Sequence, residues 1–243
     1  MVPSTSIEPE LTYASDHSLL VSFGADAGRK VSEKVLRLTS LLLHDLRKEI
    51  LNVHPAYTSV LITFDPNVTV AVELERRVHG LCERMGTVET PAPKAITIPV
   101  CYEGEFSPDL EHVARHNGLS PADVVRLHKS AAYTVCFLGF SPGFPYLAGL
   151  PEQIATPRRA SPRLRVAAGS VGIAGRQTGI YPDSSPGGWQ VIGRTPLRLF
   201  NPSLDPPSLL NMGDEVRFEP ISPARYAELT AAIGIHQPTT RGV

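Results

Sequence analysis

The second half of the chain contains a run of cations with no acidic residue among them. Between Glu152 and Asp183 the charged residues are all arginines, namely Arg158, Arg159, Arg163, Arg165 and Arg176. Arginine presents a planar fork that matches a carboxylate or a phosphate, and it stays charged when it is partly buried. The pattern therefore predicts a site for an anionic substrate. A solvated basic face, or arginines paired with acids elsewhere in the fold, is the open alternative.

Glycine, proline and aromatic residues surround this arginine run. Residues 137–151 read FLGFSPGFPYLAGLP, and residues 184–196 read SSPGGWQVIGRTP. Such a mixture is typical of tight turns on a rigid frame, because a flexible linker would lack the aromatic residues. The one tryptophan, Trp189, could stack on a substrate, although a single tryptophan is more often part of the core.

One histidine, His128, ends a predicted helix and leads into the strand that carries Phe137. Its ring could face the site as a general acid or base. It could equally be a cation at the C-terminus of the helix, where positive charge is favoured. Both interpretations stay open on the sequence alone.

Two glycine patterns resemble known motifs but fail their physical requirements. Residues 139–143 read G-F-S-P-G, a formal match to the nucleophile elbow of serine hydrolases. The elbow needs the N–H of the residue after the serine in its oxyanion hole, and Pro142 has no N–H. Gly169, Gly172 and Gly175 recur without the lysine of a phosphate loop, so close strand packing is favoured over a phosphate nest.

Composition limits the class of protein. The chain has 243 residues, a net charge of −1 and an apolar fraction of 42%. These values are typical of one large or two small globular domains and give no reason to expect nucleic acid as a partner. The three cysteines form no close pair, which favours a reducing compartment and argues against a zinc site. With no visible signal peptide and no apolar run of ~20 residues, we expect a cytoplasmic protein without a membrane segment.

Hydrophobic spacing predicts a small domain in the first half of the chain. Strands are expected at residues 11–13, 18–23, 51–53 and 59–64, and helices at residues 29–50 and 70–85. The order of two strands and a helix, repeated once, indicates an α+β sandwich with both helices on one face of the sheet. A stretch with two prolines, residues 87–95, is the predicted boundary, which places this α/β domain at residues 1–90.

Short strands dominate the second half. They are expected at residues 96–100, 133–138, 163–167, 171–174, 178–181, 189–193, 196–200 and 215–218, with helices over residues 107–116 and from residue 120. Many short strands between glycine and proline turns indicate a closed or nearly closed β-barrel over residues 91–221. Residues 222–243 are expected to form a C-terminal tail, with a helix at residues 224–233 and a disordered end.

Four runs in the second half together resemble one protein family. The runs GFSPGFPYL, TPRRASPR, GSVGIAGRQTGIYP and SPGGWQVIGRTP resemble the family of the 5-oxoprolinase B subunit, which also carries the label allophanate hydrolase subunit 1 and includes a sporulation-kinase inhibitor. The sequence is also similar to part of the carboxyltransferase domain of urea carboxylase. The resemblance spans about residues 10–220. It implies an α/β domain followed by a cyclophilin-like β-barrel.

The resemblance also implies an activity and partners. In this family, the B subunit works with a companion C subunit and with a separate A subunit, and together they use ATP to open 5-oxo-L-proline to L-glutamate. ATP would be shared with the partner subunits, and this chain has no biotin-carrier lysine motif. The chain alone is expected to be inactive, and it could form a homo-oligomer. Inhibition of a sensor histidine kinase, or carboxyltransferase or allophanate-hydrolase chemistry on another amide, is the alternative function.

Family motif positions and the charge pattern together suggest roles for single residues. Arg158 and Arg159 are the first candidates to bind an anion. Gln177 could hydrogen-bond the lactam amide, and Tyr181 could orient it. The full set of predicted site residues is His128, Arg158 and Gln177 for catalysis, and Phe140, Phe144, Tyr146, Arg159, Arg176 and Tyr181 for binding of substrate or phosphate; no metal ligand is predicted.

Overall fold

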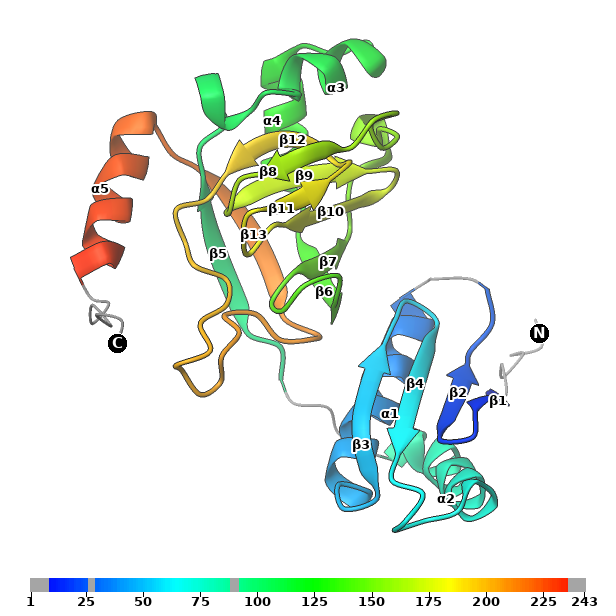
Figure 1. Ribbon diagram of the computed structural model, residues 1–243. Coiled ribbons are helices and arrows are strands. Elements are labelled where there is room, and N and C mark those ends of the chain that lie inside the picture. Colours follow the sequence, from blue (N-terminus) through cyan, green and yellow to red (C-terminus); the bar gives the residue numbers. More distant parts are fainter. Residues whose placement is uncertain (1–8, 26–28, 88–91, 236–243) are drawn as a thin grey trace. The chain divides into compact units, whose positions relative to one another are not determined.

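The chain divides into two compact units, which meet in the sequence between Ala92 and Pro93. The computed structural model describes residues 9–25, 29–87 and 92–235 (Figure 1). Part of the predicted linker, residues 88–91, lies outside the described residues. Residues 1–8 and the predicted disordered end, residues 236–243, lie outside them as well.

The first unit contains a four-stranded antiparallel sheet and two helices. Its strands pair in the order β1-β2-β4-β3, α1 contacts β3 and β4, and α2 contacts β2. Buried residues such as Leu19, Val21, Val60 and Ile62 alternate with half-exposed ones along β2 and β4, so one face of the sheet carries the core. The elements are β1 (Glu10–Ser15), β2 (Ser18–Ser22), α1 (Arg29–Asp45), β3 (Ile50–Pro55), β4 (Ser59–Phe64) and α2 (Ala71–Arg84).

Helix α1 ends earlier than the sequence predicts. It stops at Asp45 and not at residue 50. Its apolar stripe is complete one residue later, at Leu46, and the polar residues 47–49 form a turn that returns the chain to the sheet, where Ile50 pairs with Phe64. The predicted stripe itself is confirmed, because all of its residues are buried: Val31, Val35, Leu38, Leu42 and Leu46.

The second unit is rich in strands. Its main sheet contains β5 (Ala95–Val100), β6 (Tyr133–Leu138), β7 (Pro145–Ala148), β9 (Ser170–Ala174), β10 (Gln177–Ile180), β12 (Gln190–Arg194) and β13 (Glu215–Pro220). A separate antiparallel pair consists of β8 (Arg163–Val166) and β11 (Ser185–Gly187). The helices are α3 (Leu110–His116), α4 (Pro121–Ser130) and α5 (Pro223–Ile235).

The seven strands of the main sheet curve until the two edges of the sheet meet. They pair in the order β12-β9-β10-β7-β6-β13-β5, and only the β13–β5 pair is parallel. The two edge strands are joined at Cys101 and Arg194, which exchange backbone hydrogen bonds of 2.8 and 2.9 Å. The second unit is therefore a nearly closed, barrel-like sheet, as the sequence predicts.

Two short strands were missed from the sequence and one was predicted wrongly. Strands β7 and β11 contain Pro145 and Pro186, which weaken a strand pattern. The strand predicted at residues 196–200 is wrong, because the chain between β12 and β13 is irregular apart from one bridge between Phe200 and Ser208. Several prolines in that connection cannot donate a backbone hydrogen bond to a sheet.

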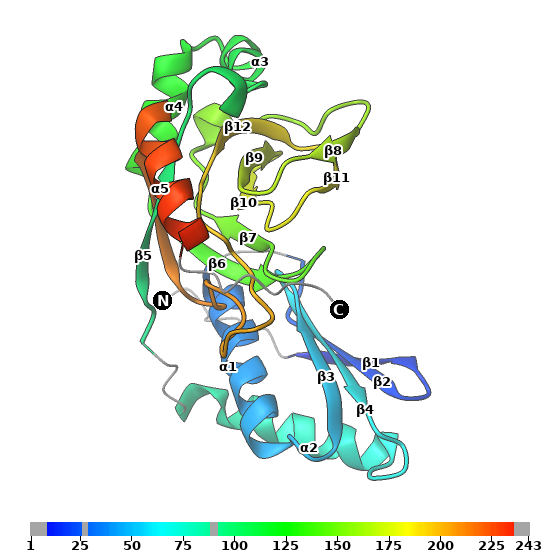
Figure 2. The ribbon, with the colours of Figure 1, turned by 60° about the vertical axis from the view of Figure 1, so that its left-hand side comes forward.

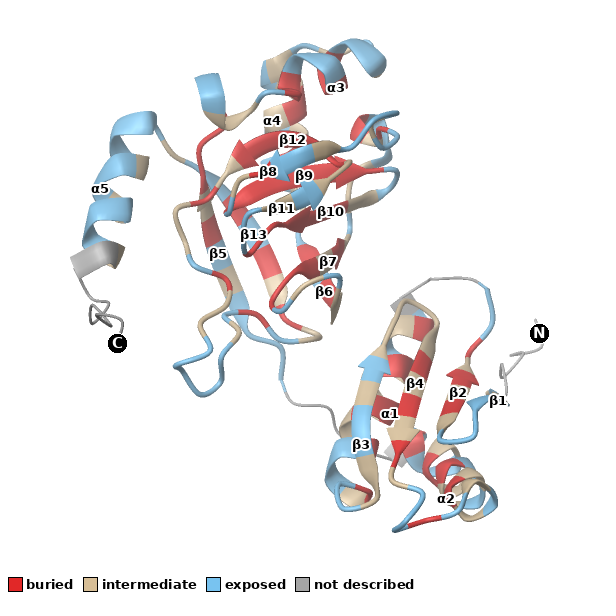
Figure 3. Cartoon of the chain, viewed as in Figure 1, coloured by how far each residue is buried: buried red, intermediate tan, exposed pale blue. Residues whose placement is uncertain are grey.

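Strands β9, β10 and β12 are almost entirely buried (Figure 3). The barrel sheet carries an apolar core on each of its two sides. All seven strands contribute to the first, here called the inner core, and α3 and α4 add Val113 and Val124 to it. The second, here called the outer cluster, lies between the sheet and the β8–β11 pair, which covers β9 and β10 in Figures 1 and 2. The outer cluster consists of Phe144, Val166, Ala174, Tyr181, Trp189 and Val191, with Tyr146 packed against it.

Candidate functional site

The outer cluster gathers most of the aromatic residues that the sequence singles out. Phe144 is at its centre, with ring centroids 5.0 Å from Tyr146, 5.2 Å from Tyr181 and 5.4 Å from Trp189. Trp189 is only 5% exposed, so its use in the core is confirmed. Glycines make this close packing possible, because a Cβ on Gly179 would lie 3.0 Å from the Phe144 ring.

Phe140 stands at the rim of the outer cluster in a strained turn. Its φ is 67°, and it is the only residue other than glycine with a positive φ in the described part of the chain. The Ser141 N–H donates to the Gly139 carbonyl at 2.8 Å, which closes a three-residue turn around Phe140. The ring is 63% exposed, with its centroid 5.4 Å from that of Phe144. Strain of this kind is most often kept where function needs it.

Arg158 is the predicted cation whose charge acts on two tyrosines of this cluster. Its side chain is exposed, and it makes no hydrogen bond or ion pair to any residue that the structure describes. Burial raises the pKa of Tyr146 and of Tyr181, and the charge of Arg158 opposes both rises. A cation whose charge reaches two tyrosines of an aromatic cluster can bind an anionic group next to a flat ring.

Two other arginines of the run are paired with a buried acid. Asp109 is 4% exposed, and its carboxylate accepts hydrogen bonds from Arg163 at 2.7 and 2.8 Å and from Arg159 at 3.1 Å. The Val191 N–H also donates to it, at 2.7 Å. Arg159 and Arg163 are therefore paired with an acid from elsewhere in the fold. This pairing is the alternative that the sequence left open.

The remaining polar candidates lie near the ends of strands. Arg176 follows the turn at Gly175 and forms an ion pair of 3.3 Å with Glu152, and both side chains are about three quarters exposed. Gln177 begins β10 and is half-buried. It shares a face of that strand with Gly179, which packs against Phe144, whereas Thr178 between them faces the inner core.

His128 lies on the opposite side of the sheet, in the inner core. It is fully buried, its ring stacks on Phe218 at 4.5 Å, and its two nitrogens lie 2.8 Å from Tyr102 Oη and 3.3 Å from Thr178 Oγ1. Burial lowers its pKa to about 3. A neutral histidine without solvent contact fits neither an acid–base role at the outer cluster nor a cation at a helix end, so the proposed site omits it.

The two glycine patterns have structural roles. The G-F-S-P-G run forms the turn between β6 and β7, and no helix follows it. Gly169 has a φ of 78°, and a Cβ there would collide with the Thr195 carbonyl. Gly172 packs against Trp189, where a Cβ would lie 3.1 Å from the tryptophan side chain. These contacts fit the prediction of close strand packing.

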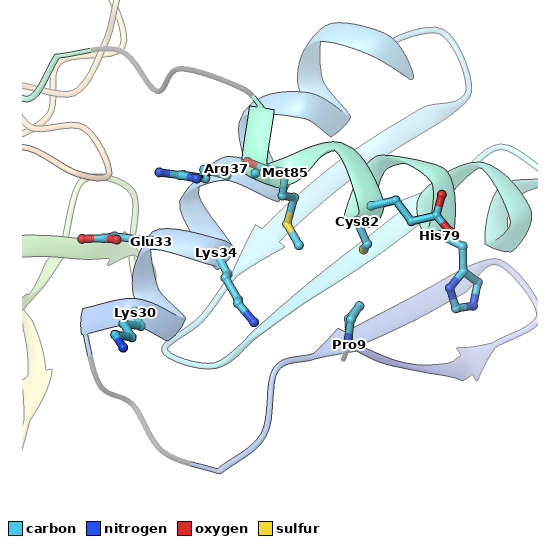
Figure 4. A pocket seen from close by; sticks show the side chains of 10 residues that line it. Pro9, Lys30, Glu33, Lys34, Arg37, His79, Cys82 and Met85 are labelled. Atoms are coloured by element: carbon cyan, nitrogen blue, oxygen red, sulfur yellow. Dashed lines mark hydrogen bonds between the residues drawn. The ribbon is translucent and has the colours of Figure 1, made fainter. Parts of the chain in front are cut away.

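A cavity of about 650 Å³ in the first unit contains none of the predicted site residues (Figure 4). Its lining includes Lys34 and Arg37 from α1 and His79 and Cys82 from α2. Burial raises the pKa of the Cys82 thiol to about 11, so this group is a poor nucleophile at neutral pH.

Within residues 9–25, 29–87 and 92–235, no group of three or more His, Cys, Asp or Glu side chains could hold a metal ion.

Sequence reasoning missed Asp109, which turns out to organise the arginine run. Asp109 stands 50 residues before Arg159 in an ordinary helix-start context, and no local pattern links the two. The arginine run itself was the only available signal, because several clustered cations need anions somewhere in the fold.

Among the described helices, none is long and apolar enough to cross a membrane.

Comparison with known proteins agrees with this architecture. The family model for the carboxyltransferase domain, subdomain C and D, matches residues 9–210. The crystal structure of TTHA0988 superposes with a TM-score of 0.75 at 36% identity. The matched region covers 84% of this chain and 40% of that longer chain, so this chain corresponds to less than half of TTHA0988.

Two curated relatives share a name. The 5-oxoprolinase B subunit of Bacillus subtilis (strain 168) is 39% identical over 235 residues, which cover 91% of this chain and 96% of the relative. The 5-oxoprolinase B subunit of Escherichia coli O157:H7 is 51% identical over 166 residues, covering 68% of this chain and 76% of the relative. With identity this high over nearly the whole length of the first relative, this chain belongs to the family of the 5-oxoprolinase B subunit.

Proposed function

We propose that this chain is the B subunit of a cytoplasmic, ATP-dependent 5-oxoprolinase that opens 5-oxo-L-proline to L-glutamate. Family membership supports the activity, since the relatives named above are components of 5-oxoprolinase. The observation that carries the site is Arg158, an exposed cation beside Tyr146 and Tyr181 with no protein partner among the described residues. The second unit would be a cyclophilin-like barrel whose outer cluster forms part of the active site.

The proposed chemistry explains why a cation and aromatic rings should lie together. A lactam is a stable amide, and transfer of the γ-phosphoryl group of ATP to its carbonyl oxygen makes the carbonyl carbon a better electrophile while ADP leaves. One water breaks the ring C–N bond, whose nitrogen becomes the amine of glutamate, and a second water releases phosphate. Catalysis of such transfers depends mainly on positioning and on stabilising negative charge.

Each side chain then has a specific task. Arg158 binds the transferred phosphoryl group or the carboxylate of 5-oxo-L-proline. Phe140 and Tyr146 bound the flat lactam ring, and Tyr181 orients it through its hydroxyl group. Gln177 hydrogen-bonds the lactam amide. Phe144 supports these rings from beneath, because it is buried and contacts both tyrosines. Arg176 is exposed enough to reach a bound anion after leaving Glu152.

The companion C and A subunits would complete the enzyme. ATP is shared with these companions, and the chain carries no biotin. Arg158 and Phe140 are both exposed in this chain alone, which fits a site that a second protein closes. The isolated chain is therefore expected to be inactive.

Reconstitution tests the proposal. Glutamate and ADP are measured from 5-oxo-L-proline and ATP with this chain alone, with its candidate companions alone, and with the full mixture. Turnover that requires the full mixture supports the proposal. Equal turnover by the companions without this chain contradicts it, and release of ADP without glutamate points to a different amide substrate.

A further inference from the structure

Asp109 connects the arginine-bearing loop to the barrel. It directly precedes α3, and its N–H donates to the Val191 carbonyl at 2.9 Å while its carboxylate accepts from the Val191 N–H at 2.7 Å. The carboxylate also accepts hydrogen bonds from both terminal guanidinium nitrogens of Arg163 and from one of Arg159. All of these hydrogen bonds converge on one buried carboxylate, so Asp109, Val191, Arg159 and Arg163 form one connected unit.

The main chain of the same loop is held on both sides of Arg158. The Gln190 side chain donates to the Pro157 carbonyl at 3.0 Å, and the Arg159 N–H donates to the Gly188 carbonyl at 2.7 Å. Both partners belong to the segment that carries Trp189 into the outer cluster. The main chain is therefore held immediately before and immediately after Arg158. Asp109 holds the same loop through the side chains of Arg159 and Arg163.

We propose that Asp109 is a positioning residue, which holds the loop of residues 157–163 and so keeps Arg158 next to the outer cluster. The three nearby arginines then have different tasks. Arg163 and Arg159 bind Asp109 and fix the loop, and Arg158 is left to bind the anionic group of the substrate. The role of Arg158 in this inference rests on the proposed function. The conformation of the loop does not, because it is argued from hydrogen bonds alone.

The expected effect of losing Asp109 follows from geometry. Asn at this position keeps the shape and one acceptor but loses the charge, so two cations lose their counterion and the loop loses its anchor. A catalytic group displaced by about 1 Å can cost about 100-fold in rate. We expect Asp109→Asn to lower kcat/KM of the assembled enzyme by about 10–100-fold.

A double-mutant comparison separates positioning from general damage. If Asp109 acts through Arg158, Asp109→Asn has little further effect, less than about threefold, in an enzyme that already carries Arg158→Ala. A purely structural role lowers activity by the same factor in both backgrounds, and that result overturns the proposal. Should Asp109→Asn fail to fold, Arg163→Lys replaces it, because lysine keeps the charge but cannot make the two-nitrogen contact.

Limited proteolysis gives a readout that does not depend on activity. Trypsin is added to the full-length chain below its unfolding temperature, and cleavage after Arg158 and Arg159 is followed by mass spectrometry, with cleavage after the exposed Arg76 of the first unit as internal reference. We expect at least about tenfold faster cleavage of the loop in Asp109→Asn than in wild type, with unchanged cleavage at Arg76. Equal loop cleavage in the two proteins overturns the proposal, whereas an inactive wild-type assembly overturns only the proposed function.

Discussion

The two sides of the barrel sheet hold their polar side chains in opposite ways. On the inner side, His128 is fully buried, bonded to Tyr102 and Thr178, and its pKa falls to about 3. On the outer side, the Arg158 side chain is exposed to solvent, and its charge opposes the rise that burial causes in the pKa of Tyr146. The inner side therefore uses a polar group as a neutral packing element, and the outer side leaves a charge unpaired among the described residues.

This difference shows why residue type alone is a weak guide to a site. A histidine at the end of a helix and an arginine in a loop both looked suitable for chemistry in the sequence. Burial separates them, because a group that cannot meet solvent or substrate cannot exchange a proton with either. The same distinction applies within the arginine run. Arg159 and Arg163 form ion pairs with Asp109, whereas Arg158 has no ion pair among the described residues.

The largest expected difference between the two sides is in stability. His128→Ala removes a fully buried ring, and it should lower the free energy of unfolding by about 3–5 kcal/mol, as for other buried rings. Phe140→Ala truncates the largely exposed ring at the rim of the outer cluster, and it should cost about 1 kcal/mol or less. Chemical denaturation of both variants measures this, and similar losses would show that the inner and outer sides are not distinct.

A second expected difference is in the response to acid. His128 has a folded pKa of about 3, below its unfolded value near 6.5, so the unfolded state binds a proton first as the pH falls. Its contribution to stability is complete above about pH 6.5 and is lost towards pH 3, at about 1.4 kcal/mol per pH unit. The non-titrating variant His128→Gln should therefore lose about 2 kcal/mol less than wild type between pH 7 and pH 5 in urea unfolding. An identical loss in both proteins would remove His128 from the acid response.

The smallest expected effect concerns the strained turn at the rim. Glycine usually makes a folded chain less stable than alanine at the same position. At a position with a positive φ, such as Phe140, glycine is the more stable of the two, because it has no Cβ. Phe140→Gly should be more stable than Phe140→Ala by about 1 kcal/mol, measured by thermal or denaturant unfolding. If the alanine variant is the more stable one, the turn at Phe140 is not strained in solution.

Much of the barrel was predictable because its signals are local. Runs of β-branched and aromatic residues between glycine and proline turns marked β6, β9, β10 and β13 nearly to the residue. The start of α4 was equally clear, since Ser120 accepts a hydrogen bond from the Asp123 N–H as a helix cap should. Recognition of the family also depended on local runs.

The missed features depend on contacts between distant residues. The end of α1 depends on the pairing of Ile50 with Phe64, and the division of labour among the arginines depends on Asp109, 50 residues away from Arg159. The burial of His128 depends on Phe218, which lies on the last strand of the barrel. No spacing rule within one segment carries this information.

The most direct test of the central claim, that the outer side carries the chemistry, compares two arginine variants in the reconstituted assembly. Arg158→Ala removes the unpaired cation, and Arg165→Ala removes an exposed cation of β8 that bonds only Ser184 among the described residues. Glutamate formation is measured at saturating ATP and 5-oxo-L-proline, with thermal unfolding as a check on folding. The account predicts a loss of about 100–1,000-fold for Arg158→Ala and less than about twofold for Arg165→Ala. Near-normal turnover by a folded Arg158→Ala enzyme would contradict it.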